Sequence, residues 1–296
     1  MNSIDIESKK FLGQPKNFVS IFNALLFDGQ PVLKPEYLKD ENSELVMNVS
    51  SKHVDIIKRY EDGTYLDLFV IESQSYVDQC MVARVMEYEC VARMRYIRQN
   101  FKKHVPMHTR LPMILTVVLY VGESKWNAAK RLSELEIIHP GFEDMFNEFK
   151  LNLIELNTNH KYNTGEKATQ DFFDLLRMIY RKQILKENLD REFNRDALYF
   201  AYVVTKNKEL LNIYQESEKG DVKVCRALDE MFEESTNKRI QMGIKQGIEQ
   251  GVERGVKNTQ IKIAIKMLVR NNQTLEEISE IVGLDLDALR ELKKSI

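Results

Sequence analysis

The strongest constraint on the fold is a continuous apolar run, LPMILTVVLYV, at residues 111–121, which Gly122 ends. The run is 11 residues long, whereas a helix needs about 20 to span a bilayer. Its β-branched residues and its length favour a strand that is buried on both faces. We therefore expect a sheet whose central strand is covered on either side.

The remaining periodicities place helices around this strand. Residues 8–27 repeat their apolar positions with a helical period, and a turn at 27–31 closes them. The other expected elements are strands at 53–60, 64–71 and 150–156, a helix over 81–101, and helices without a convincing strand from residue 169 onward. Strands that alternate with helices indicate an α/β core, which an all-helical extension follows.

Composition narrows the class of protein. The 296 residues are 43% hydrophobic and 30% charged with a net charge of −2, which describes a globular chain without global basic character. The N-terminus lacks the pattern of a secretory signal, and the odd set of three cysteines has neither metal nor redox spacing. We expect a cytoplasmic protein that does not enter a membrane, with buried, reduced thiols.

The C-terminal part contains an internal repeat of four residues, with glycine at positions 243, 247, 251 and 255 and an Ile or Val after each. Glycine costs about 1 kcal/mol in a helix relative to alanine, so close approach of a partner helix would explain it; a marginally helical linker is the alternative. The predicted divisions are a core at 1–165, a helical extension at 166–242, a glycine-repeat helix at 243–273 and a helical hairpin at 274–296.

The last segment predicts two short helices. Thr274 and Glu277 form a capping box, Gly283 ends the first helix, and Asp285 caps the second. The pattern resembles a helix-turn-helix, but six acids against three bases would meet phosphates with the wrong sign. A packing or dimerisation hairpin is the interpretation that the charge favours.

Two β-rich runs around Asp62-Gly63 predict a hairpin. A two-residue loop pairs Glu61 with Thr64, Arg59 with Leu66, Lys58 with Asp67 and Asp55 with Val70. Asp55 then shares a face with Glu72 and is its diagonal neighbour, about 7–8 Å away. Two carboxylates at that separation can hold one divalent cation; the alternative places both at a solvated rim of the sheet.

Several segments in this order resemble the Rpn family of recombination-promoting nucleases, also called putative transposases, in the PD-(D/E)XK superfamily. The segments are Asp55, the Glu72-Ser73-Gln74-Ser75 stretch, Arg84 to Tyr88, residues 22–29, residues 119–123 with Trp126, the strand near 150–156, and the C-terminal repeats with the TLEEISEIVGL segment. The resemblance covers nearly the whole chain, and its strength lies in the order of the segments together with the tail.

The resemblance implies a restriction-endonuclease-like mixed sheet and cleavage of DNA with Mg²⁺ or Mn²⁺. Asp55 and Glu72 match the metal-binding acids, the carbonyl of Ser73 is a further ligand, and Gln74 is the third catalytic residue. The superfamily places Lys at the position of Gln74, so one positive charge is missing. Candidates for a third acidic ligand, by sequence position only, are Asp28 and Glu36.

A basic stretch follows these residues. Residues 80–131 contain ten Lys or Arg and three acids, which is consistent with a phosphate-positioning surface; an ordinary solvated helix face is the alternative. The expected DNA contacts are Arg84, Tyr88, Arg95, Lys102 and Lys103. We expect a metal-dependent DNA endonuclease of recombination or mobile elements that forms a homo-oligomer through its C-terminal helices; the alternative is a catalytically silent DNA-binding or oligomerising adaptor.

Overall fold

The computed structural model describes residues 3–41, 56–63, 66–101, 104–184, 191–217 and 220–295. The chain divides into two compact units, Met1–Glu230 and Met231–Ile296. Within the described residues, no helix is both long enough and apolar enough to cross a membrane.

A mixed five-stranded sheet, in the order β1-β2-β3-β4-β5, forms the centre of the first unit. The first three strands are antiparallel, and β3, β4 and β5 run parallel to one another. The strands are β1 (Leu38–Asp40), β2 (Ile56–Glu61), β3 (Leu66–Gln74), β4 (Ile114–Tyr120) and β5 (Asn152–Glu155). This arrangement confirms the predicted mixed sheet, in which parallel β3 and β4 end side by side.

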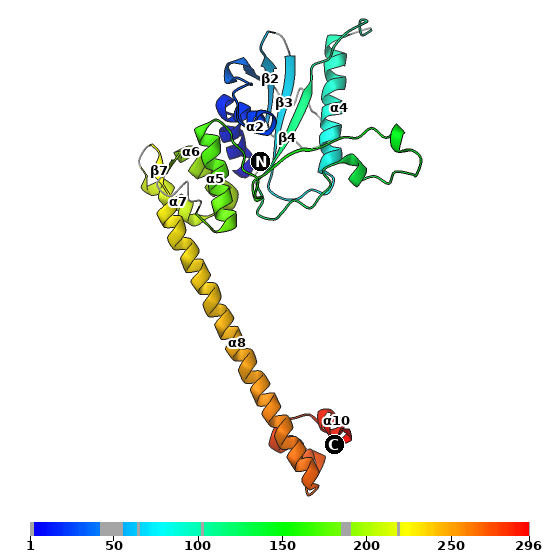
Figure 1. The fold of residues 1–296 in the computed structure, drawn as a ribbon, viewed down its shortest axis with the longest axis vertical. Helices are drawn as coiled ribbons and strands as arrows, with labels where there is room; N and C mark the ends of the chain where they lie inside the picture. Colours follow the sequence, from blue (N-terminus) through cyan, green and yellow to red (C-terminus); the bar gives the residue numbers. More distant parts are fainter. Residues whose placement is uncertain are drawn as a thin grey trace. The chain divides into compact units, whose positions relative to one another are not determined.

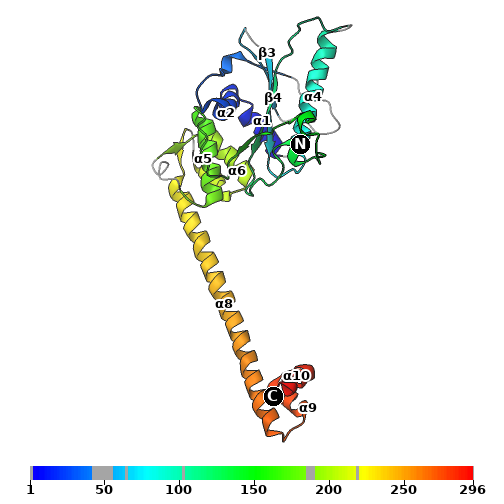
Figure 2. The same cartoon turned by 45° about the vertical axis from the view of Figure 1, so that its right-hand side comes forward.

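Helices cover both faces of the sheet, as Figures 1 and 2 show for α4 (Met81–Asn100) on one side and α2 (Pro15–Phe27) on the other. Val70 belongs to a core cluster with Tyr88 of α4, whereas the ring of Phe69 lies 4.8 Å from that of Phe22 of α2. Because side chains alternate along a strand, the even-numbered residues of β3 face α4. The apolar run expected at 111–121 is buried over most of its length and provides the central strand β4.

The register of the β2–β3 hairpin differs from the prediction. Glu61 lies opposite Leu66, so the connection has four residues and not two. The pairing therefore shifts by two positions: Arg59 lies opposite Leu68, and Val70 lies opposite Ile57. A shift of two keeps every side chain on its predicted face, because the side-chain period of a strand is two.

The predicted cross-strand pair of Lys58 and Asp67 is accordingly wrong. Lys58 lies opposite Phe69, and its ammonium group pairs with Asp40 on β1. Asp67 instead accepts a hydrogen bond from the backbone N–H of Met113, 3.1 Å away. The error has one cause, the length of the turn, which the Asp-Gly signal does not specify.

The N-terminal helix predicted at 8–27 is two helices, α1 (Ser3–Leu12) and α2. Gly13 stands at the break, where a Cβ would lie 2.2 Å from the carbonyl oxygen of Lys9, and Pro15 begins α2. The expectation of buried thiols also fails for two residues, since Cys80 and Cys90 are exposed while Cys225 is buried.

After β5 the chain is helical, as expected, except for one short pair of strands. The helices are α5 (Lys167–Arg181), α6 (Arg195–Thr205) and α7 (Lys208–Glu216); the 3-10 turn η1 (Pro35–Tyr37) lies before the sheet. Strand β6 (Glu192–Phe193) pairs with β7 (Val222–Lys223) in a small antiparallel ladder. Sequence analysis predicted no strand here, because two residues are too few to show an alternating pattern.

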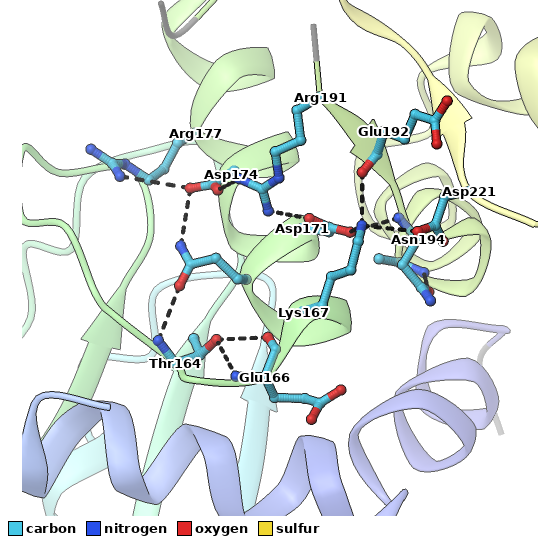
Figure 3. A network of polar contacts seen from close by, with 12 residues as sticks. Thr164, Glu166, Lys167, Asp171, Asp174, Arg177, Arg191, Glu192, Asn194 and Asp221 are labelled. Carbon is cyan, nitrogen blue, oxygen red and sulfur yellow. Dashed lines mark hydrogen bonds and ion pairs between the residues drawn. The ribbon is translucent and has the colours of Figure 1, made fainter. Parts of the chain in front are cut away.

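A buried polar network joins α5 to the segment before α6 (Figure 3). Asp171 is fully buried and accepts hydrogen bonds from the Lys167 ammonium, 2.7 Å away, and the Asn194 backbone N–H, 2.6 Å away. The guanidinium of Arg191 bridges Asp171 and Asp174. Buried carboxylates are stable only with such partners, so this network holds the helices together.

The second unit contains most of α8 (Cys225–Arg270), followed by α9 (Leu275–Val282) and α10 (Leu286–Lys294). Ala264 and Leu268 of α8 pack with Ile278 and Leu289 in a small apolar core. The capping signals confirm the predictions: the box at Thr274 and Glu277 is present, Gly283 ends α9 with φ 72°, and the side chain of Asp285 caps α10.

Candidate functional site

Glu72 and Gln74 lie at the carboxyl end of β3, opposite Val118 and Tyr120 of β4. Both are even-numbered residues of β3 and share its α4 face. Each side chain belongs to a residue that is only 4% exposed. A buried carboxylate and a buried amide two residues apart on one strand are costly without partners, which marks this position as a polar site inside the sheet–helix interface.

Arg84 supplies the first partner. Its Nη2 lies 3.2 Å from Oε1 of Glu72, its Nη1 pairs with Asp78, and the hydroxyl of Tyr88 accepts from Nε and Nη2 at 3.1 and 2.7 Å. We call Glu72, Asp78, Arg84 and Tyr88 the arginine clamp. Arg84 and Tyr88 are four residues apart and therefore share a face of α4, which lies against Glu72.

The clamp keeps Arg84 charged. Burial by itself lowers the pKa of Arg84, but hydrogen bonds to Asp78 and Tyr88 and the charge of Glu72 outweigh it, so the net pKa is raised. Burial is also the main cause that raises the pKa of the Tyr88 phenol above its ordinary value. The site at neutral pH therefore contains a guanidinium cation and a neutral phenol beside the Glu72 carboxyl group.

Gln74 presents an unused donor. Its backbone carbonyl accepts from the N–H of Val121 at 2.8 Å. Its side-chain Nε2 is buried and has no hydrogen-bond partner in the part of the chain that the structure describes. Such a donor fits an acceptor ligand, such as water or a phosphate oxygen.

The side chain of Ser73 lies on the other face of β3, where its Oγ is 3.4 Å from Oγ of Ser8 in α1. The ligand that the resemblance implied at Ser73 is its backbone carbonyl, and this side chain is not part of it. Asp28 is exposed and ends α2 with φ 51°, and Glu36 is exposed in η1. Both candidates for a third acid thus stand in solvent-facing turns, without a contact to Glu72 among the described residues.

Three predicted residues, Asp55, Lys102 and Lys103, lie outside the described residues. In the ranges that are described, no three His, Cys, Asp or Glu side chains gather as a metal centre. Asp55 is the residue before Ile56 in the chain, and Ile56 lies opposite Ile71, the residue before Glu72.

Arg95, the remaining predicted DNA contact, does not belong to the clamp. It lies farther along α4 and lines a cavity of about 260 Å³. The other residues around this cavity are Glu41, Arg59, Leu68, Ala92, Tyr96, Gln99 and Asn100.

Two acids at this end of the sheet, Asp78 and Glu155, were not predicted from the sequence. Asp78 orients Arg84 and also accepts from the backbone N–H of Cys80 at 2.9 Å, just before α4 begins. Its position before a helix start was a signal that could have identified it. Glu155 is buried at the end of β5 and accepts from the N–H of Trp126 at 2.8 Å, a contact between distant segments that leaves no local signal.

A comparison with known protein families finds the same family as the sequence resemblance. The family described as "Putative transposase, YhgA-like" matches residues 36–209, which is more than half of the chain and includes the whole central sheet. No curated protein and no solved structure matches the chain. The described family is connected with mobile elements by its name. The chain is therefore a member of the YhgA-like transposase family, which belongs to the Rpn/YhgA family of PD-(D/E)XK nucleases, as the sequence resemblance predicted.

Proposed function

We propose that this protein is a metal-dependent DNA endonuclease that hydrolyses phosphodiester bonds during recombination or movement of mobile elements. The observation that carries the proposal is the pair of buried side chains, Glu72 and Gln74, on one face at the carboxyl end of β3. Family membership supports it, because the parent family consists of nucleases. The carboxyl ends of parallel strands are also a common location for ligands in α/β sheets.

The residues at this site fit a divalent cation. Asp55, Glu72 and the carbonyl of Ser73 would hold Mg²⁺ or Mn²⁺, since all three offer the hard oxygen ligands that these ions prefer. When bound, the cation would activate water and offset charge on the scissile phosphate. The unpaired Nε2 of Gln74 supports the same assignment, because it is a buried donor for which the described protein atoms provide no acceptor.

The protein's own residues then have distinct roles. Gln74 would orient water or a phosphate oxygen through its amide, and Arg84 would contribute the positive charge that Gln74 lacks. Arg95, Lys102 and Lys103 would contact the DNA backbone, which carries the affinity in most complexes with nucleic acid. Tyr88, which is buried and accepts from Arg84, would position that arginine.

We also propose that α8 joins copies of the chain into a homo-oligomer. Ile244, Ile248 and Val252 are exposed along one line of the helix. A Cβ at Gly247 or Gly251 would meet no described atom within 4 Å. A ridge of β-branched residues beside a glycine groove, both spaced by four residues, suits the packing of two helices at about −50°.

One observation favours the alternative, a silent DNA-binding adaptor. The guanidinium of Arg84 lies against the same Glu72 carboxylate that would bind metal. If this ion pair is permanent, it removes a ligand from the cation. The nuclease therefore requires that metal or DNA displace Arg84 from Glu72, whereas the adaptor does not.

The test is nicking of supercoiled plasmid by the full chain with Mg²⁺, Mn²⁺, Ca²⁺ or EDTA. Glu72→Gln and Asp55→Asn should abolish metal-dependent cutting, because each removes a charged ligand while keeping the side-chain shape. Glu89→Gln is the matched control, a buried carboxylate of α4 that accepts from the Thr116 N–H outside the site.

Equal cutting by Glu72→Gln and the unsubstituted protein would refute the site. A folded protein that binds DNA and cuts under none of these conditions would support the adaptor.

A further inference from the structure

An acidic loop, residues 132–149, leaves the core between β4 and β5 (Figure 1, green). Its base is closed by hydrogen bonds: the N–H of Leu132 donates to Phe149 at 2.9 Å, and Arg131 bridges to Lys150 in antiparallel fashion. The loop includes two short turns, η2 (Leu132–Glu134) and η3 (Glu143–Met145). The two ends of the loop are therefore held together by backbone hydrogen bonds.

Large apolar side chains of the acidic loop face solvent. Ile137 is 102% exposed, Met145 is 78% exposed, and Phe142 is 57% exposed. Burial of one such side chain is worth about 1.5–3 kcal/mol, so their joint exposure on one loop indicates a surface that a partner covers.

The charge of the loop specifies the partner's chemistry. It contains no Lys or Arg and five acids, all exposed: Glu134, Glu136, Glu143, Asp144 and Glu148. Glu148 accepts from Ser133, and Glu134 accepts from the backbone N–H of Lys130, whereas Glu136 is exposed beside Ile137 in the chain. A complementary surface would be both basic and apolar.

The same chain carries such a surface. We call residues 93–113, the end of α4 and the segment after it, the basic tip; it contains six Lys or Arg and no Asp or Glu. Its described part exposes Met107 (84%), Met113 (50%) and the charged side chains of Arg98 and Arg110. The 260 Å³ cavity lined by Arg95 and Tyr96 opens beside it and is large enough for an aromatic side chain.

We propose that the acidic loop of one copy docks on the basic tip of a second copy. Phe142 and Ile137 would bury their apolar surface against the tip, with Phe142 directed to the cavity, while loop carboxylates surround Arg98 and Arg110. The association does not depend on nuclease activity. One consequence alone rests on the proposed function: DNA should compete with the loop, because both use the basic tip.

Site-specific crosslinking tests the proposal on the full chain. The photoreactive residue benzoylphenylalanine replaces Ile137, and this protein is mixed with an isotope-labelled copy that lacks it. Mass spectrometry should find crosslinks from the loop of the first copy to residues 93–113 of the labelled copy. Crosslinks confined to one chain, crosslinks to α8, or no crosslink would overturn the proposal.

Charge reversal provides a second readout. Glu136→Arg with Glu143→Arg on the loop should lower the crosslink yield by about tenfold, as should Arg98→Glu with Arg110→Glu on the tip. Mixing a loop-reversed copy with a tip-reversed copy should restore the yield, which only an intermolecular contact can do. Failure of this rescue would refute the pairing.

The matched control is Glu253→Arg, an exposed reversal on α8 that should leave the loop crosslink unchanged. It separates docking of the loop from association through α8.

Discussion

Replacement of Arg84 by alanine is the sharpest test of the arginine clamp. The substitution removes a guanidinium that contacts the Glu72 carboxylate at 3.2 Å and the Tyr88 hydroxyl at 2.7 Å, and that also pairs with Asp78. The buried Glu72 carboxylate then loses the cation that contacts it. The variant should therefore be destabilised by more than an ordinary surface substitution.

The magnitude follows from burial. The Arg84 side chain is 17% exposed and that of Glu72 is 6% exposed, so solvent screens their attraction weakly. Removal of one partner from a buried pair costs about 3–5 kcal/mol, and residual exposure places this pair near 3 kcal/mol. For a unit of this size, the melting temperature should fall by about 6–12 °C.

Urea unfolding can be followed through Trp126, the only tryptophan of the chain, which is buried in the same unit. A double-mutant cycle with Glu72→Gln isolates the pair, and the double variant should lose less stability than the sum of the single variants. Arg98→Ala is the matched control, an exposed arginine of the same helix, and should change stability by less than about 0.5 kcal/mol.

The melting temperatures of the same variants can also be compared with and without metal. If Arg84 and a divalent cation compete for Glu72, Mn²⁺ should raise the melting temperature of Arg84→Ala more than that of the unsubstituted protein, because ligand binding to the folded state stabilises it. A loss below about 0.5 kcal/mol for Arg84→Ala, or zero coupling with Glu72→Gln, would refute the reasoning.

Three further predictions concern the scaffold around the site, each read by Trp126 fluorescence during urea unfolding. Asp171→Asn should cost about 2 kcal/mol, because Lys167 and Arg191, which are partly exposed, lose the buried carboxylate that pairs with both; a loss under 1 kcal/mol would show that about one hydrogen bond at most was involved. Tyr180→Phe should cost about 1 kcal/mol at neutral pH, since the hydroxyl donates to the Val121 carbonyl. Burial raises the pKa of Tyr180 above its ordinary value of about 10, so the tyrosine ionises first in the unfolded chain and the free energy of unfolding falls as pH rises above about 10. Tyr180→Phe should show a shallower fall of stability with pH, and equal slopes for the two proteins would contradict this. Gly122→Ala should cost about 1–3 kcal/mol, because a Cβ there would lie 2.4 Å from the hydroxyl of Tyr120; unchanged stability would mean that the tyrosine moves away freely.

Much of the site could be predicted because its signals are local. Glu72 and Gln74 alternate with buried residues along one strand, so their common face follows from the period of two. The difference in hairpin register moves no side chain to the other face of the sheet, since the register is shifted by an even number of residues. The turn length itself was not predictable from Asp62-Gly63, because the same dipeptide occurs in loops of several lengths.

The clamp could be predicted only in part. Arg84 and Tyr88 share a helix face by their spacing of four, and this is visible in the sequence. That Arg84 binds Glu72 and Asp78 at the same time depends on where α4 packs across the sheet, a non-local property.

Local sequence signals specify the elements: a buried central strand at 114–120, a helix beginning at Met81, and the capped helices at the end of the chain. These follow from periodicity and capping, which act over a few residues. Which charges meet, as in the arginine clamp and the Asp171 network, follows from the tertiary packing instead. Such contacts join residues far apart in the chain, and their energies depend on burial, which the folded arrangement alone sets.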